Sequence, residues 1–275
     1  MRIRLGYSAD PDDAFMFWAL AAGAIDPRGF EFEHVVTDIG TLNGWALEGK
    51  LEVTALSLHA YPHVQDSYVL LPHGASMGSG YGPVVVSREP LTLDGLPDVE
   101  VAIPGRSTTA YLVLKMVMGG EFECRELPFD QILDEVRSGA APAGLLIHEG
   151  QLTYASHGLH KVVDLGEWWL LETGLPLPLG VNVARRDIGE RLPELSAVLR
   201  ESIGAGLANR EEAMKYAMRF GRGIDTGIAD RFVAMYVNDI TCEIGDEGRS
   251  AVEELLRRAE EIGAYDHPVR LEFVD

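Results

Sequence analysis

Short apolar runs alternate along the chain with longer segments in which apolar residues recur every three or four positions. The runs are typical of buried strands, and the longer segments of helices that cover them. The predicted strands span residues 3–7, 30–36, 53–58, 68–71, 83–87, 99–103, 144–147 and 162–165. The predicted helices span residues 13–22, 42–48, 109–118, 131–137, 195–208, 211–220, 228–237 and 250–262. This alternation predicts an α/β fold with parallel sheets.

Two similar segments indicate how the chain is divided. The segments "GPVVVSRE" (82–89) and "GVNVARRD" (180–187) each join a glycine, a β-branched strand and a charged end. We interpret them as two strands that cross between two α/β lobes, with a ligand cleft between the lobes. This predicts a larger, discontinuous domain I of residues 1–88 and 187–275, and a smaller domain II of residues 89–186.

The net charge narrows the set of partners. The chain of 275 residues has an ordinary 47% of hydrophobic residues, but its formal net charge is −20. A negative field repels nucleic acid and anionic membrane surfaces, so we expect neither as a partner. An anionic ligand would need a local site built from backbone N–H groups.

Cysteine content and hydropathy favour a cytoplasmic location. The two cysteines, Cys124 and Cys242, are far apart and form no CxxC pair, so a disulfide framework is not expected. The first residues lack the apolar core of a secretory signal, and no run approaches the ~18 apolar residues of a membrane span.

His148 is the first candidate for chemistry. It follows the predicted strand 144–147 in the stretch "AGLLIHEGQLTY". Ligands of open α/β sheets bind outside the carboxyl ends of strands, and histidine is the commonest general base. A structural histidine held by a backbone bond is the alternative. The motif is not the HExxH of zinc proteases, because residue 152 is a leucine.

The stretch "IPGRSTTAY" (103–111) is the second candidate. A strand ends there, Pro104 and Gly105 turn the chain, and Thr108 and Thr109 begin a helix. Hydroxyls and N–H groups at a helix start can bind a carboxylate without net positive charge. Plain helix capping is the alternative.

Three further polar residues follow or face strand ends. Ser8 follows the predicted strand 3–7, Ser57 lies at the end of the predicted strand 53–58, and Asn43 begins a short helix, so all three could contact a polar ligand. The neighbouring "SADPDDAF" (8–15) holds three carboxylates, which suit the start of a helix. Because they lack the spacing of a calcium loop, we expect no metal there.

These stretches together resemble the 1,4-dihydroxy-6-naphthoate synthase family of the futalosine route to menaquinone. The markers are LGYS, TLNGWALEGKL, GYGPVVVSR, VAIPGRSTTAY, AGLLIHEGQLTY, VVDLGEWW and TGLPLPLG, spread over nearly the whole chain. The resemblance implies two α/β lobes joined by two crossing strands, as in type II periplasmic binding proteins.

The resemblance also implies a lyase that converts cyclic dehypoxanthine futalosine, a small-molecule carboxylate, to 1,4-dihydroxy-6-naphthoate. His148 would be the catalytic base. Thr108 and Thr109 would hold a carboxylate or polar group, and Asn43 and Ser57 would line the cleft. No metal or organic cofactor is implied, and a homodimer is suggested by the family alone.

One stretch departs from the family pattern. The family's first turn is close to SPCPNDTF, whereas this chain has SADPDDAF, with Asp12 and Ala14 in place of an asparagine and a threonine. A carboxylate in place of an amide removes a donor and adds negative charge. Two alternatives therefore stay open: a non-catalytic solute-binding or sensing protein of the same fold, and the sister chorismate dehydratase.

Overall fold

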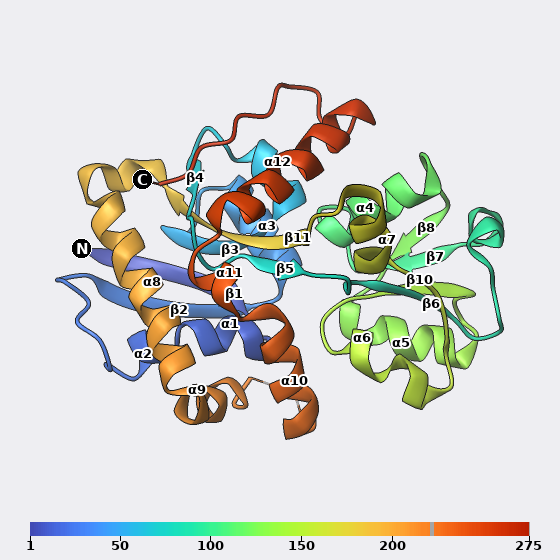
Figure 1. Ribbon diagram of the computed structural model, residues 1–275, viewed down its shortest axis with the longest axis horizontal. Helices are drawn as coiled ribbons and strands as arrows, with labels where there is room; N and C mark the ends of the chain where they lie inside the picture. The colour runs from blue at the N-terminus through green and yellow to red at the C-terminus, as the bar shows by residue number, and fades with distance from the viewer. Residues whose placement is uncertain (221–222, 275) are drawn as a thin grey trace.

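The computed structural model describes residues 1–220 and 223–274, which form two α/β lobes side by side (Figure 1). The sheet of the first lobe has the order β2-β1-β3-β11-β4, with β5 paired to β11. Its strands are β1 (Arg2–Ser8), β2 (Glu31–Thr37), β3 (Val53–Ser57), β4 (Tyr68–Leu70), β5 (Ser76–Gly78) and β11 (Leu177–Arg185). The sheet of the second lobe has the order β10-β6-β9-β7-β8. Its strands are β6 (Val84–Ser87), β7 (Val101–Ile103), β8 (Cys124–Glu126), β9 (Ala143–Leu146) and β10 (His160–Asp164).

Helices cover both sheets. The α-helices before β11 are α1 (Pro11–Met16), α2 (Trp18–Ala21), α3 (Ile39–Leu47), α4 (Thr109–Met118), α5 (Phe129–Ser138), α6 (Gly150–Thr153) and α7 (Leu165–Thr173). Those after it are α8 (Leu192–Ala208), α9 (Arg210–Ala217), α10 (Thr226–Tyr236), α11 (Asp239–Cys242) and α12 (Gly245–Glu261). The 3-10 helices are η1 (Leu58–His63), η2 (Leu93–Asp98), η3 (Tyr154–His157) and η4 (Arg186–Arg191). The chain thus returns to the first lobe with β11 and stays there, where α8 to α12 lie (Figure 1).

The prediction of parallel sheets is wrong for the strands that arrive from the other lobe. In the first sheet β1 is parallel to β2 and β3, but β11 is antiparallel to β3, β4 and β5. In the second sheet β7 is parallel to β8 and β9, but β6 is antiparallel to β9 and β10. The reason is geometric: β11 and β6 enter at the sheet edge where β3 and β9 end, so they run the opposite way.

Strand pairing also moves both crossings to earlier residues than 88 and 186. Val84–Ser87 pairs wholly within the second sheet, and Leu177–Arg185 pairs wholly within the first. The two similar segments therefore mark strands that lead away from the crossings and do not span between lobes. The chain passes between the sheets just before β6 and just before β11.

The apolar core continues from one lobe to the other. One cluster of buried residues includes Leu56 of β3, Val85 of β6, Val101 of β7 and Leu145 of β9. Separate clusters lie under the helices of the first lobe and between the second sheet and α5. Buried packing, as well as the crossing segments, therefore holds the lobes together.

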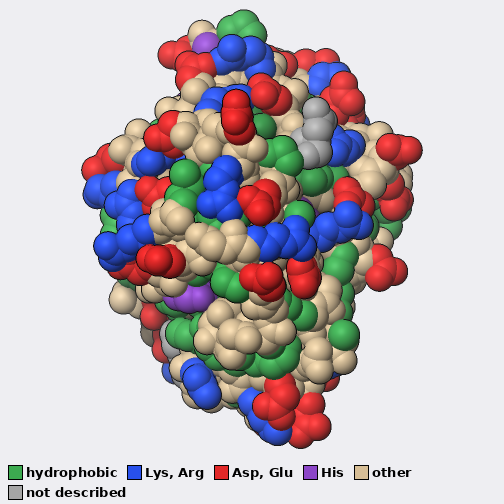
Figure 2. Space-filling view, turned by 90° about the vertical axis from the view of Figure 1, so that its left-hand side faces the viewer, with side chains coloured by type: hydrophobic (Ala, Val, Ile, Leu, Met, Phe, Trp, Pro, Cys, Tyr) green, Lys and Arg blue, Asp and Glu red, His purple; other side chains and the backbone are tan. Residues whose placement is uncertain are grey.

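The surface of the first lobe is charged but mixed in sign. Acidic and basic side chains are interspersed over the end of the molecule shown in Figure 2. Among the ion pairs of this lobe, Arg28 pairs with Glu201 and Arg191 with Glu194. Exposed pairs of this kind stabilise a fold by little. Within residues 1–220 and 223–274, no helix is both long and apolar enough to cross a bilayer.

Candidate functional site

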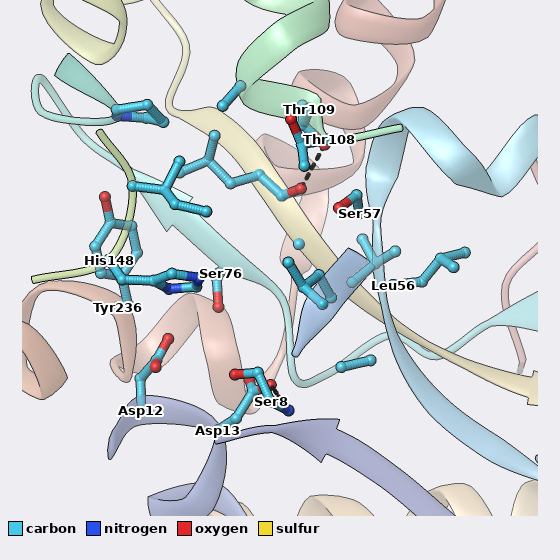
Figure 3. Close-up of a pocket in the computed structure, with 18 of the residues that line it drawn as sticks. Ser8, Asp12, Asp13, Leu56, Ser57, Ser76, Thr108, Thr109, His148 and Tyr236 are labelled. Atoms are coloured by element: carbon cyan, nitrogen blue, oxygen red, sulfur yellow. Dashed lines mark hydrogen bonds between the residues drawn. The ribbon is translucent and has the colours of Figure 1, made fainter. Parts of the chain in front are cut away.

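A cavity lies where strands of both sheets end (Figure 3). It contains about 710 Å³ of empty space, part of it open to solvent, which is in the size range of small-molecule sites. The first lobe supplies Ser8, Ser57 and Tyr236, and the second supplies Thr108 and His148. A ligand in this cavity would therefore contact both lobes.

Ser8 and Ser57 line the cavity because β1 and β3 are parallel and end at the same sheet edge. Ser8 is 4% exposed, and its backbone N–H donates to Oδ2 of Asp13 at 2.7 Å. Ser57 is 5% exposed. Both predicted positions are therefore on the cavity wall.

Asn43 is not among the lining residues, so the structure corrects its predicted place. It is 1% exposed and its side chain faces the backbone of β3 and the turn before α4. Its Oδ1 accepts from the N–H of Ser57 at 2.9 Å, and its Nδ2 donates to Oγ of Ser57 at 3.0 Å and of Ser107 at 3.2 Å. Asn43 thus supports the wall from behind and ties the first lobe to the start of α4.

The start of α4 lies in the cavity wall, but its threonine hydroxyls donate to backbone carbonyls. Thr108 is the N-cap: its Oγ1 accepts from the N–H of Tyr111 at 3.2 Å and donates to the carbonyl of Gly105 at 2.7 Å. Oγ1 of Thr109 donates to the carbonyl of Leu179 at 2.6 Å. The backbone N–H groups of Thr109 and Ala110 have no acceptor within the described ranges. These N–H groups lie at the positive end of the helix dipole, an arrangement that can bind an anion.

His148 follows β9 and turns into the cavity from a left-handed backbone conformation. Its φ is 53°, which is uncommon for a residue with a side chain. Its Nδ1 lies 3.2 Å from Oδ2 of Asp10, which is only 2% exposed. The edge of Phe129 packs on the ring, with centroids 4.8 Å apart. Nε2 is buried and has no hydrogen-bond partner among the described residues.

Gln151 and Tyr236 hold the backbone of His148, and sequence reasoning missed both. In the amide orientation that satisfies both ends, Oε1 of Gln151 accepts from the His148 N–H at 3.2 Å. Its Nε2 then donates to the Tyr236 hydroxyl and to the carbonyl of Gly82, both at 2.7 Å. Gln151 lies three residues after His148 in the same stretch of sequence, and this nearness is a signal that could have identified it. Tyr236 gave no signal, because it comes from α10 in the other lobe.

Asp10, Asp12 and Asp13 stand at the start of α1, as their sequence pattern predicts. All three are nevertheless buried, which the pattern does not indicate, and the Asp10 side chain makes no capping bond. Asp12 and Asp13 line the cavity, and Oδ1 of Asp12 has no partner in the described chain. Burial raises the pKa of both carboxyls, and the neighbouring carboxylates raise it further. A bond from the Ser8 N–H limits the rise for Asp13, whose pKa is about 6.

Two lobes of this topology around a ligand-sized cavity define a protein with the periplasmic-binding-protein fold. The alkanesulfonate-binding protein of Xanthomonas axonopodis pv. citri has this fold, with a TM-score of 0.71 over 96% of this chain and 92% of its own. It is 11% identical, so the likeness concerns the fold alone. A crystal structure of an Archaeoglobus fulgidus protein is much nearer. It has a TM-score of 0.91 and 46% identity over 96% of this chain and 98% of its own.

Sequence comparison gives the family. The model of the menaquinone biosynthesis family matches residues 3–261, and the chain belongs to that family. A 1,4-dihydroxy-6-naphthoate synthase of Thermus thermophilus is 45% identical over 95% of each chain. One of Streptomyces coelicolor is 38% identical over 94% of this chain and 92% of its own. The chain is therefore an enzyme of menaquinone biosynthesis, as the resemblance implied.

Proposed function

We propose that this enzyme converts cyclic dehypoxanthine futalosine to 1,4-dihydroxy-6-naphthoate, with His148 as the general base. The two synthases at 45% and 38% identity support the product. One observation in the site carries the role of His148: its buried Nε2 has no partner among the described residues, although the ring lines the cavity. An unpaired buried nitrogen is unfavourable by ~1–3 kcal/mol unless a ligand or water pairs with it.

The substrate's negative end would bind at the start of α4. There the N–H groups of Thr109 and Ala110 point their hydrogens away from the helix, and no arginine or lysine is among the described lining residues. Backbone N–H groups would hold the carboxylate by hydrogen bonds, so the site needs no positive side chain although the chain has a net charge of −20. The carbon acid of the substrate would then lie towards His148 of the second lobe.

The reaction then needs a base and exclusion of water. His148 removes a proton from the bound substrate, and loss of that proton sets off carbon–carbon cleavage and aromatisation. The apolar wall of Phe232, which is buried, and of Ile147 and Leu179, which are half-buried, keeps solvent from the reacting carbon. In a water-poor cavity the charge that develops on the substrate is stabilised by fixed donors and not by solvent.

Turnover of the synthetic substrate tests this proposal. The wild-type protein is mixed with cyclic dehypoxanthine futalosine, and naphthoate is followed by its absorbance or fluorescence. His148→Ala and His148→Gln should each reduce kcat by about 10²–10⁴-fold, because a positioned general base contributes that much. Equal rates for wild type and variants would remove His148 from the reaction.

We also predict that the protein needs no cofactor, lies in the cytoplasm and forms a homodimer. Calorimetric titration with candidate cofactors tests the first prediction. Fractionation of cells tests the second, and the molecular mass in solution tests the third.

A further inference from the structure

We propose that Asp10 is the positioning residue of His148, supplied by the opposite lobe, and that it fixes which ring nitrogen acts as the base. This inference rests on the proposed role of His148. Asp10 stands between β1 and α1 in the first lobe, whereas His148 follows β9 in the second. The 3.2 Å contact between Oδ2 and Nδ1 therefore joins the lobes at the cavity wall.

The chemistry of the two groups assigns the hydrogen. A carboxylate has only acceptors, so an imidazole nitrogen that faces it at 3.2 Å is favoured when it carries hydrogen. A neutral imidazole with hydrogen on Nδ1 has its lone pair on Nε2. That is the nitrogen with no partner in the described part of the chain, and only a lone pair can accept the substrate's proton.

Residues of both lobes also fix the backbone and the ring of His148. Its N–H and carbonyl both bond to Gln151, and the Gln151 amide bonds in turn to Tyr236 of the first lobe. Phe232 of the first lobe also faces the ring, with centroids 6.4 Å apart. The left-handed φ of 53° is unfavourable by itself, so these contacts keep it in place.

Two carboxylates near the ring are thus assigned different tasks. Asp10 contacts Nδ1 of His148. Asp13 accepts from the Ser8 N–H and acts on the site through its charge. Asp12 lies beside them with Oδ1 unpaired among the described residues. Removal of the Asp10 charge should therefore change the tautomer of His148, and it should leave the Asp13 bond to β1 in place.

Nitrogen NMR of protein labelled at histidine tests the tautomer without any substrate. His148→Gln identifies the His148 signals by their disappearance. In the wild type we expect the hydrogen on Nδ1 and the lone pair on Nε2. Asp10→Asn and Asp10→Ala should abolish this preference, and Asp10→Glu should restore part of it. An unchanged tautomer in both neutral variants, or hydrogen on Nε2 in the wild type, would overturn the proposal.

Turnover gives the second measurement. Asp10→Asn should reduce kcat by about 10–100-fold with a smaller change in KM, because loss of the carboxylate that orients a functional histidine has effects of this size. Asp225→Asn is the matched control. It makes the same change at the N-cap of α10, where Asp225 accepts from the N–H groups of Gly227 and Ile228. The control should keep the wild-type tautomer and kcat.

The two proposals fail in different ways. If no enzyme form converts cyclic dehypoxanthine futalosine, the proposed function is wrong, yet the tautomer measurement still decides the role of Asp10. If the wild type turns over and Asp10→Asn matches it in kcat and tautomer, only the role of Asp10 is wrong.

Discussion

Asn43 and Ser57 are joined by two hydrogen bonds that close the end of β3 against α3. Oδ1 of Asn43 accepts from the Ser57 N–H at 2.9 Å, and Nδ2 donates to the Ser57 hydroxyl at 3.0 Å. Asn43→Ala leaves a buried N–H without an acceptor, so we expect the free energy of unfolding to fall by ~1–3 kcal/mol. Denaturant unfolding measures it. Asn209→Ala, at an exposed helix end, is the control and should change it by less than about 0.5 kcal/mol.

Thr108 should matter more for stability than for substrate affinity. Its hydroxyl caps α4 and donates to Gly105, so Thr108→Val should lower the free energy of unfolding by ~0.5–2 kcal/mol. Thr108→Ser keeps the hydroxyl and should recover most of the loss. A large rise in KM at unchanged stability would instead assign the hydroxyl to the substrate.

The buried Asp13 should make stability fall as the pH rises. Its folded pKa is about 6, raised by burial above the usual value near 3.8. A raised folded pKa means that its favourable contribution is complete below about pH 4 and is lost as the pH passes through 6. One pKa unit is about 1.4 kcal/mol, so the rise from 3.8 to about 6 makes the loss on the order of 3 kcal/mol.

Asp13→Asn isolates this effect, since an amide oxygen can still accept from the Ser8 N–H. The difference in unfolding free energy between variant and wild type should grow between pH 4 and pH 7 in favour of the variant. A difference that does not vary with pH would show that Asp13 does not titrate in this range.

The buried His73 should make the free energy of unfolding fall as the pH falls, the opposite of the effect of Asp13. Burial, with a smaller effect from Arg200, lowers its pKa from 6.5 to about 4. A lowered folded pKa in a base means that its contribution is present above pH 6.5 and is lost as the pH falls towards 4. His73→Gln should therefore lose less stability than wild type between pH 6.5 and 4, by on the order of 3 kcal/mol. Parallel stability curves for the two proteins would contradict this.

Gly144 is a test of how tightly α5 packs on the strand that leads to His148. A Cβ at this position would lie 2.6 Å from Cγ2 of Ile132 and 2.7 Å from Cγ2 of Val136. Gly144→Ala should lower the free energy of unfolding by ~1–3 kcal/mol through overpacking. Gly204→Ala, where a Cβ would meet nothing within 4 Å, is the control and should not destabilise the protein.

The sequence was sufficient for features that depend on the local pattern. Alternating elements predicted an α/β fold, and a polar residue at the end of an apolar run placed Ser8, Ser57 and His148 at strand ends, where the structure has them. The family resemblance agreed with the same stretches. Features that depend on hydrogen-bond direction were not predicted. Hydroxyls at a helix start can bind a ligand or cap the helix, and only the structure shows that Thr108 caps α4.

Features that depend on long-range contact were also beyond the sequence. Asp10 and His148 are far apart along the chain, and nothing local distinguishes a buried carboxylate from one that favours a helix start. The same holds for Gln151 and Tyr236, which meet across the lobes. The antiparallel direction of β6 and β11 follows from the crossing itself, which apolar runs do not encode.

Both crossings lead directly into residues of the cavity. Pro83 stands just before β6 and Leu179 lies near the start of β11, and both are in the cavity wall. Any change in the angle between the lobes must therefore change the shape of the cavity wall that a ligand contacts. By linkage, a substrate that fits one angle better than another shifts the enzyme towards it, so affinity and domain orientation form a single equilibrium.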